Sequence, residues 1–294
     1  MAGGRFAPSP TGSLHLGNLR TALAASISAR GRRVPFVVRM EDLDRVTASK
    51  EHELGQLADL AAIGIDWDGE VVRQSERFER YADALSDLVS GGRTYSCWCT
   101  RREIREAAAA PHSVGAEGRY PGACRDLSVA EINKRREGGR PPAVRLRADG
   151  AVMSFDDLIA GSQTRVADDV VLRRNDGVPA YQLAVVIDDA AQGIDEVIRG
   201  DDLLDSTAAQ LLLIDLLGLD RPTHGHVPLV VAPNGERLAK RHGAVTLGEL
   251  AARGVSANEV RSRLLSSLGW SAVDPAANWS AIPSAPFIYH PGNW

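Results

Sequence analysis

The chain of 294 residues has little of several features that mark specialised proteins. No apolar run is long enough to span a membrane, and the N-terminus lacks a signal-peptide pattern. The three cysteines favour a reducing compartment over a disulfide framework. A net charge of -4 excludes a protein that is basic overall, so an RNA partner would need a local basic patch. We therefore expect a cytoplasmic globular protein without membrane association.

Two short basic runs are candidates for such a patch, residues 30–33 (RGRR) and 134–136 (KRR). A solvated charged surface explains either run equally well.

Strand-like and helix-like segments alternate along most of the chain, which indicates an α/β fold with a doubly wound parallel sheet. The pattern predicts strands at 34–40, 194–200 and 226–232, and helices at 49–63, 75–90, 204–217 and 246–269. In the helix at 49–63, the face expected to be buried carries Leu54, Leu57, Leu60 and Ala61. The alternation fails between about 95 and 175, so this region is interpreted as an insertion.

Residues 5–18, RFAPSPTGSLHLGN, are the most informative segment. Its two prolines favour an extended backbone, Gly12 permits a turn, and apolar residues at 16–27 then follow helical spacing. A strand that turns tightly into a helix N-terminus presents free N–H groups and the positive end of the helix dipole, which favours phosphate binding. His15 adds a hydrogen-bond donor for a phosphoryl oxygen. The segment therefore predicts an ATP site.

This segment resembles the first signature of the class I aminoacyl-tRNA synthetases, and its RFAPSPTG string resembles the glutamate-specific branch of that family. The resemblance implies ATP contacts by His15, Gly17 and Asn18. It also implies that the amino-acid pocket includes Arg5, Ala7 and Ser9.

Further residues resemble the amino-acid pocket of the same branch. Residues 39–44, RMEDLD, resemble its RIEDTD string, and residues 198–207, IRGDDLLDST, resemble its RGEDLLxST segment. By this resemblance Glu41 receives an α-ammonium group, Tyr181 lines the pocket, and Arg199 pairs with a side-chain carboxylate, which favours glutamate over glutamine. Each of the three alone has an ordinary structural explanation, so their order along the chain carries the prediction.

Residues 237–241, RLAKR, resemble the mobile KMSKS loop of class I synthetases. A cation there stabilises the charge that shifts to pyrophosphate. Lys240 matches the second lysine of the motif and is predicted to take this role, whereas Arg237 stands where the first lysine is expected. Their relative contributions stay open, because arginine keeps the charge but has a different geometry.

The cysteines suggest a metal site. Cys97 and Cys99 place two thiolates on one short loop, and Cys124 supplies a third ligand for a tetrahedral ion. Three buried cysteines without a metal are the alternative. The CxC pair and the YPGAC string at 120–124 resemble the zinc-binding insertion of the glutamyl-queuosine tRNA(Asp) synthetases, where a tyrosine is the fourth ligand. The resemblance implies one structural Zn²⁺ held also by Tyr120, with His112 as the chemical alternative.

The motifs occupy residues 5–270 in the order of the catalytic half of a glutamyl-tRNA synthetase. The predicted organisation is a Rossmann-like catalytic domain at 1–95 and 176–245, an inserted zinc-binding acceptor subdomain at 96–175, and a helical tail at 246–294. The residues after 270 are too few for an anticodon-binding domain, and this favours the glutamyl-queuosine tRNA(Asp) synthetases.

Membership of that family implies activation of L-glutamate with ATP and Mg²⁺, followed by transfer to the queuosine base in the anticodon loop of tRNA(Asp). No obligate protein partner is expected. Two alternatives stay open. One is a truncated glutamyl-tRNA synthetase that charges the 3′ end of tRNA(Glu). The other is a non-catalytic tRNA- or nucleotide-binding paralogue, supported only by the altered RLAKR loop.

Overall fold

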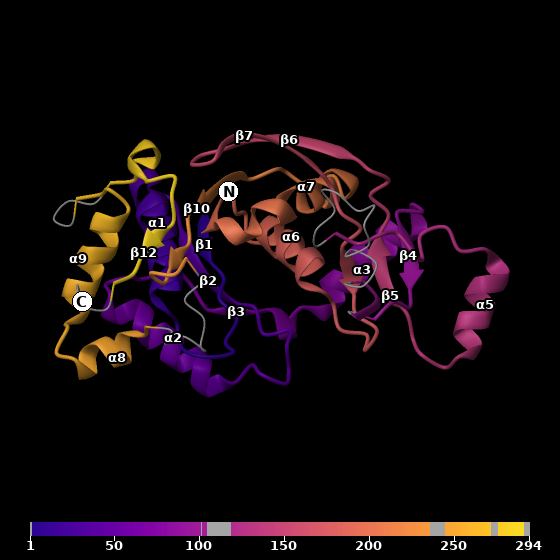
Figure 1. Ribbon diagram of the computed structural model, residues 1–294, viewed down its shortest axis with the longest axis horizontal. Coiled ribbons are helices and arrows are strands. Elements are labelled where there is room, and N and C mark those ends of the chain that lie inside the picture. The colour runs from indigo at the N-terminus through magenta and orange to yellow at the C-terminus, as the bar shows by residue number, and fades with distance from the viewer. Residues whose placement is uncertain (1, 101, 105–118, 236–244, 272–275, 291–294) are drawn as a thin grey trace.

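A computed structural model describes residues 2–100, 102–104, 119–235, 245–271 and 276–290 (Figure 1). Three residues singled out above, His112, Arg237 and Lys240, lie outside these ranges. Among the described helices, none combines the length and the apolar composition that a bilayer span requires.

The main sheet has seven strands in the order β3-β2-β1-β9-β10-β6-β7. The strands are β1 Gly4–Phe6, β2 Phe36–Met40, β3 Val72–Arg73, β6 Val152–Asp157, β7 Gly161–Val166, β9 Glu196–Gly200 and β10 Thr223–Val227. All neighbours pair in parallel except the hairpin of β6 and β7. Strands β1, β2 and β3 follow one another toward one edge of the sheet. Strands β9 and β10 continue from β1 toward the other edge. This order confirms the predicted doubly wound sheet and puts its topological switch between β1 and β9.

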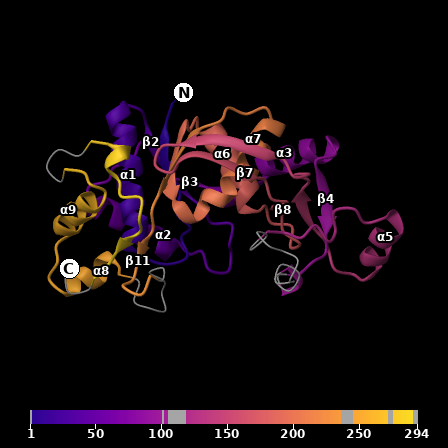
Figure 2. The same cartoon turned by 45° about the horizontal axis from the view of Figure 1, so that its top comes forward.

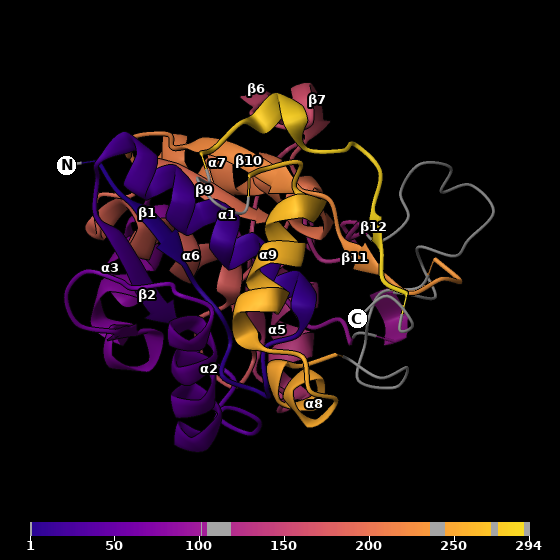
Figure 3. The same ribbon diagram turned by 90° about the vertical axis from the view of Figure 1, so that its left-hand side faces the viewer.

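Helices cover both faces of this sheet, with α1 and α9 in front of β1 and β2 in Figure 3 and α6 behind them. The helices are α1 Leu16–Arg32, α2 Lys50–Ala62, α3 Phe78–Ser90, α6 Tyr181–Ala191, α7 Thr207–Leu216, α8 Leu247–Ala252 and α9 Ala257–Ser267. Short 3-10 turns lie at Gln74–Glu76, Asp201–Ser206 and Trp279–Ala281. One buried apolar cluster joins α1, α2 and α9 to β1 and β2, and a second joins α3, α6 and α7. The two faces of the sheet are therefore packed separately.

A second, antiparallel sheet has the order β4-β5-β8, with β4 Thr94–Cys97, β5 Ala143–Leu146 and β8 Val171–Arg173. Helix α5, Val129–Glu137, projects from this end of the molecule (Figure 2) and buries none of its residues. The β6–β7 hairpin lies between β5 and β8 in sequence but joins the main sheet through β10. Residues 96–175 thus contribute to both sheets, and the subdomain boundaries stay a prediction.

The buried face predicted for the helix at 49–63 is right in part: Leu60 is buried and Leu57 packs against the core, but Leu54 and Ala61 are exposed. Leu54 is 57% exposed, whereas Glu53 and Gln56 are buried. The Gln56 amide donates hydrogen bonds to the carbonyl oxygens of Ser9 and Gly12 at 2.9 and 2.7 Å. Gln56 is therefore buried because it holds the loop that follows β1, whereas Glu53 is buried in ion pairs with Arg73 and Lys50.

The single strand predicted at 226–232 is two strands. β10 ends at Val227, and β11, Val230–Val231, pairs instead with β12, Phe287–Ile288. Pro228 lies between them and has no N–H to continue the ladder. The helix predicted at 246–269 is also divided, into α8 and α9, near Gly254 with its φ of +83°.

Candidate active site

A cavity of about 770 Å³ opens at the carboxyl ends of β1 and β9. Ligands of doubly wound folds bind where the strand order switches, because the connections diverge there and leave a crevice. The cavity is lined by nine residues predicted above to bind ATP or glutamate: Arg5, Ala7, Ser9, His15, Gly17, Asn18, Glu41, Tyr181 and Arg199. The fold thus brings together motifs that are far apart in the sequence.

His15 is the N-cap of α1. Its Nδ1 accepts hydrogen bonds from the N–H groups of Gly17 and Asn18 at 3.1 and 3.4 Å, and Asn18 Oδ1 accepts from the His15 N–H at 3.1 Å. The HLGN motif is therefore a capping box in which histidine replaces the usual serine or threonine. Burial lowers the pKa of His15 and favours the neutral ring. Because Nδ1 accepts, the ring proton lies on Nε2, which remains a donor.

Glu41 follows β2 directly and has few charge partners. Arg39 lies 3.4 Å from its carboxylate, but the same guanidinium also binds Asp189 at 2.8 Å. Arg5 binds Asp189 as well, at 3.3 Å. Burial raises the pKa of Glu41 to about 7, against the attraction of Arg39 and Arg5. Glu41 therefore remains able to receive a cationic group from a ligand.

Arg199 is the penultimate residue of β9, and neutral acceptors hold its guanidinium. Nε donates to His226 Nε2 at 2.9 Å, and the two terminal nitrogens donate to Gln210 Oε1 at 2.7 Å and Thr207 Oγ1 at 2.8 Å. Arg199 is 5% exposed, and within the described ranges it forms no ion pair with a carboxylate. Burial lowers its pKa. A buried cation without a counter-charge favours an anionic ligand.

Residues that precede and follow 236–244 in the sequence lie near the HLGN motif. Val230 lines the cavity, and after the gap the Val245 carbonyl accepts a hydrogen bond from the Leu16 N–H at 3.1 Å. Thr246 forms a β-bridge with His15. Val245 and Thr246 thus contact the HLGN motif directly.

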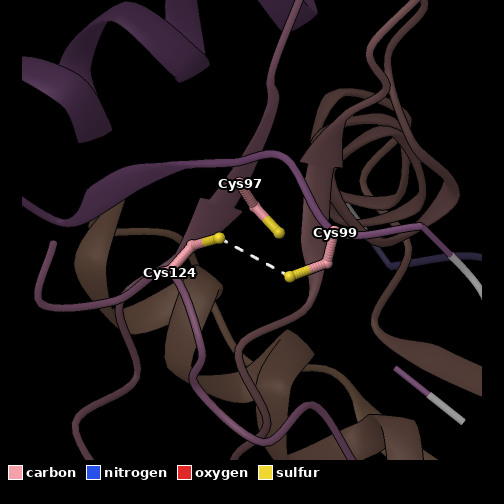
Figure 4. Close-up of side chains that lie close together, drawn as sticks. All are labelled: Cys97, Cys99 and Cys124. Atoms are coloured by element: carbon pink, nitrogen blue, oxygen red, sulfur yellow. Dashed lines mark hydrogen bonds between the residues drawn. The ribbon is translucent and has the colours of Figure 1, made fainter. Parts of the chain in front are cut away.

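Three cysteine side chains converge beside the antiparallel sheet (Figure 4). The sulfur atoms of Cys97, Cys99 and Cys124 all lie within 4.8 Å of one another, with Cys99 and Cys124 at 3.5 Å. The Tyr120 hydroxyl lies 3.3 Å from the sulfurs of Cys97 and Cys99. A tetrahedral zinc site, with bonds of about 2.3 Å to sulfur and about 2.0 Å to oxygen, has ligand separations of about 3.5–3.8 Å. The four side chains therefore fit a tetrahedral metal.

The predicted ligand Tyr120 is held in place by neighbours that the sequence did not reveal. The Cys124 N–H donates to the Tyr120 hydroxyl oxygen at 2.9 Å, and the Arg145 guanidinium lies 3.8 Å from the centre of the Tyr120 ring. The Arg145 guanidinium thus places a positive charge beside the cysteine cluster.

Several polar residues of the main site were also missed. Asp157, Asp189 and His226 are buried around the cavity arginines, yet none belongs to a recognised motif. The available signal was acidic and imidazole side chains inside apolar segments, in VVIDD at 185–189 and HGHV at 224–227. Such groups need buried partners, which a linear pattern does not identify.

The family model for the catalytic domain of class I tRNA synthetases (E and Q) matches residues 3–278, so the chain belongs to this family. The chain is 56% identical over 266 residues to the glutamyl-Q tRNA(Asp) synthetase of Nocardia farcinica, covering 90% of this chain and 84% of the relative. The corresponding protein of Cutibacterium acnes is 50% identical over 271 residues, covering 91% and 76%. The predicted resemblance to this branch is confirmed, and the protein is an enzyme of the aminoacyl-tRNA ligase type.

Glutamate-specific ligases are also similar. The glutamate–tRNA ligase of Nitratidesulfovibrio vulgaris is 40% identical over 270 residues, but the match covers only 57% of that protein. The glutamate–tRNA synthetase structure from Elizabethkingia anophelis superposes with a TM-score of 0.81 at 26% identity, covering 99% of this chain and 68% of that one. Methionyl-tRNA synthetase from Mycobacterium tuberculosis, with a TM-score of 0.56 at 14% identity, shares the fold.

Proposed function

We propose that the protein activates L-glutamate with ATP and transfers the glutamyl group to the queuosine base of tRNA(Asp). The observation that carries the first half is the charge pattern of the cavity, where Arg199 is a cation without a carboxylate partner and Glu41 is an acid with few partners. An amino acid with an acidic side chain supplies both missing charges. Its γ-carboxylate binds Arg199, and its α-ammonium group binds Glu41.

The adenylate forms by in-line attack of the glutamate α-carboxylate on the α-phosphorus of ATP, and pyrophosphate leaves. His15 donates from Nε2 to a phosphoryl oxygen as charge develops, and Lys240 stabilises the departing pyrophosphate, with Arg237 as an additional cation. ATP enters with Mg²⁺, which neutralises part of the phosphate charge. A hydroxyl group of the queuosine cyclopentenediol then attacks the adenylate carbonyl and releases AMP. Positioning and electrostatics account for this chemistry without a general base.

The choice of RNA position rests on the relatives. Proteins that match 76–84% of their own length at 50–56% identity are named for the queuosine-containing tRNA(Asp), whereas the glutamate–tRNA ligase match covers 57% of that protein. Charging of the 3′ end of tRNA(Glu) is the second candidate, favoured by the TM-score of 0.81 with a glutamate–tRNA synthetase.

The activation step is tested by ATP–pyrophosphate exchange in the presence of single amino acids. We expect exchange with glutamate and at least about a thousandfold lower kcat/KM with glutamine, because the amide brings no charge to Arg199. Equal use of glutamine, or no exchange with any amino acid, would contradict the proposal.

Glutamate use should depend on the protonation of Glu41. With its pKa at about 7, Glu41 is increasingly neutral below pH 7 in the free enzyme and then attracts an α-ammonium group weakly. kcat/KM for glutamate should therefore rise with pH up to about 7 and level off above it. In Glu41→Gln the value should be low and lack this inflection. Glu76→Gln, which changes a side chain that is 65% exposed, is the control. Matching pH profiles in the wild type and Glu41→Gln would exclude the assignment.

We also propose that Cys97, Cys99, Cys124 and Tyr120 hold one structural Zn²⁺. A complete set of four protein ligands would fix the local fold and leave no open coordination position for catalysis. Protein purified without chelator should contain about one zinc per chain by elemental analysis, and Cys124→Ser should contain little. Tyr120→Phe should lose metal to a chelator faster than the wild type.

The neighbouring variant Tyr95→Phe is the matched control, because the Tyr95 hydroxyl donates to Asp169 instead of facing the sulfurs. It should retain its metal. Absence of stoichiometric metal from the wild type would refute the zinc proposal.

A further inference from the structure

A chain of buried hydrogen bonds leads from Arg199 on β9 across β10 to Asp157 on β6. Arg199 Nε donates to His226 Nε2 at 2.9 Å, and His226 Nδ1 lies 2.5 Å from Asp157 Oδ2. The side chains of His226 and Asp157 are both 0% exposed. They come from neighbouring strands, β10 and β6, and are 69 residues apart in the sequence.

Asp157 is fixed as a hydrogen-bond acceptor. Its Oδ1 accepts from three backbone N–H groups, those of His226 at 3.1 Å, Ile159 at 3.0 Å and Ala160 at 2.8 Å. Burial acts to raise the pKa of Asp157, but these bonds and the one with the His226 ring lower it to about 2. Asp157 therefore presents an ionised Oδ2 to the imidazole.

The carboxylate determines the tautomer of His226. Burial lowers the pKa of His226, which favours a neutral ring. Facing an ionised oxygen, Nδ1 carries the proton and donates to Asp157, so Nε2 keeps its lone pair. That lone pair is what the Arg199 Nε–H requires. A proton on His226 Nε2 would instead point at the Arg199 Nε–H, which is itself a donor.

We propose that Asp157 and His226 are positioning residues that orient the Arg199 guanidinium for the side-chain carboxylate of the amino acid. The inference rests on the proposed function and extends it to residues that no motif contains. His226 secures Nε, while Gln210 and Thr207 each take one N–H of the terminal nitrogens. Nη2 makes a second, longer contact with the Leu203 carbonyl oxygen at 3.5 Å, and Nη1 keeps an N–H for the carboxylate of the amino acid. Because His226, Gln210 and Thr207 are all neutral, they orient the guanidinium without neutralising its charge, which remains available to the substrate carboxylate.

Asp157→Asn tests the tautomer with almost no change in volume. Three N–H groups point at the Oδ1 position, so the amide oxygen of the new side chain must occupy it. The amide NH₂ then faces His226 Nδ1 and moves the ring proton to Nε2. Arg199 Nε loses its acceptor and the guanidinium reorients.

We expect Asp157→Asn to raise KM for glutamate about tenfold to a hundredfold in ATP–pyrophosphate exchange, with KM for ATP unchanged. The discrimination between glutamate and glutamine should fall in parallel. Asp156→Asn is the matched control, because it changes the adjacent carboxylate, which is exposed and accepts from Ser162 Oγ at 2.6 Å. It should behave as the wild type.

A double-mutant cycle tests whether Asp157 acts through the imidazole. His226→Phe removes the acceptor but keeps a ring, and adding Asp157→Asn to it should raise KM for glutamate little further. Additive effects of the two changes would overturn the proposal.

A spectroscopic measurement on the wild type does not depend on whether the variants fold. Long-range ¹H–¹⁵N spectra should show His226 as the Nδ1–H tautomer, and the Nε2–H tautomer would overturn the inference. The activity measurements distinguish failure of the proposed function from failure of the positioning role. A wild type that activates no amino acid refutes the proposed function, whereas normal activation together with an unchanged KM in Asp157→Asn refutes only the positioning role.

Discussion

Replacing Arg199 with methionine is expected to lower kcat/KM for glutamate by about a thousandfold or more. The variant keeps an unbranched apolar stem but removes the buried guanidinium of the cavity that lacks a carboxylate partner within the described residues. Without this cation, the γ-carboxylate of glutamate would be buried without a hydrogen-bonding partner, which weakens binding strongly. The KM for ATP should change little, because the phosphate contacts are assigned to other residues.

Loss of folding must be separated from loss of binding in this variant, since Arg199→Met leaves His226, Gln210 and Thr207 without their donor. Arg199→Lys keeps the charge but not the planar fork, so intermediate activity is expected. Arg165→Met is the surface control, because Arg165 pairs with Asp205, which is 86% exposed. Stopped exchange in Arg199→Met with an unchanged melting temperature supports the assignment. Near-normal kcat/KM in Arg199→Met would rule it out.

Replacing His15 with asparagine is expected to slow adenylate formation about a hundredfold while leaving the protein stable. Asparagine is among the best N-cap residues, so it preserves the cap of α1 that His15 Nδ1 now provides. It does not preserve the Nε2–H donor, which is proposed to stabilise the transferring phosphoryl group. His15→Ala should lose the same activity and, in addition, about 1 kcal/mol of unfolding free energy.

The comparison of the two His15 variants separates the cap from the catalytic contact. Ser256→Ala is the matched control, because Ser256 caps α9 away from the cavity and accepts from the Glu259 N–H at 3.3 Å. It should lose stability without losing activity. Chemical denaturation gives the stabilities and ATP–pyrophosphate exchange gives the rates. Full exchange activity in His15→Asn would show that the histidine has only a structural role.

Much of the fold could be predicted because it depends on local pattern. The turn and the helix start at 12–16 follow from Gly12 and the apolar spacing after His15, and the order of segments determines a doubly wound sheet. The buried face of α2 could be predicted only in part, since Leu60 is buried as expected but Gln56 is buried as well. Gln56 is buried because it meets carbonyl oxygens more than forty residues earlier in the chain, and helical periodicity does not record such partners.

The candidate site was likewise predictable where it depends on sequence motifs and not where it depends on long-range contacts. Residues within motifs, such as Glu41 and Arg199, could be named from the sequence because their order along the chain resembles a family, and the structure places them on one cavity. Their buried partners could not be named. Asp157 reaches His226 only because the β6–β7 hairpin leaves the predicted insertion and pairs with β10. That pairing is a tertiary contact without a sequence signature.

The central claim is most directly tested by locating the glutamyl label on RNA. The protein would be incubated with ATP, labelled glutamate and total tRNA prepared with or without queuosine, and the RNA would then be cut with a nuclease. Our account predicts label on an anticodon fragment, and only in the pool that contains queuosine. Label on the 3′-terminal adenosine would contradict it and would make the protein a compact glutamyl-tRNA synthetase.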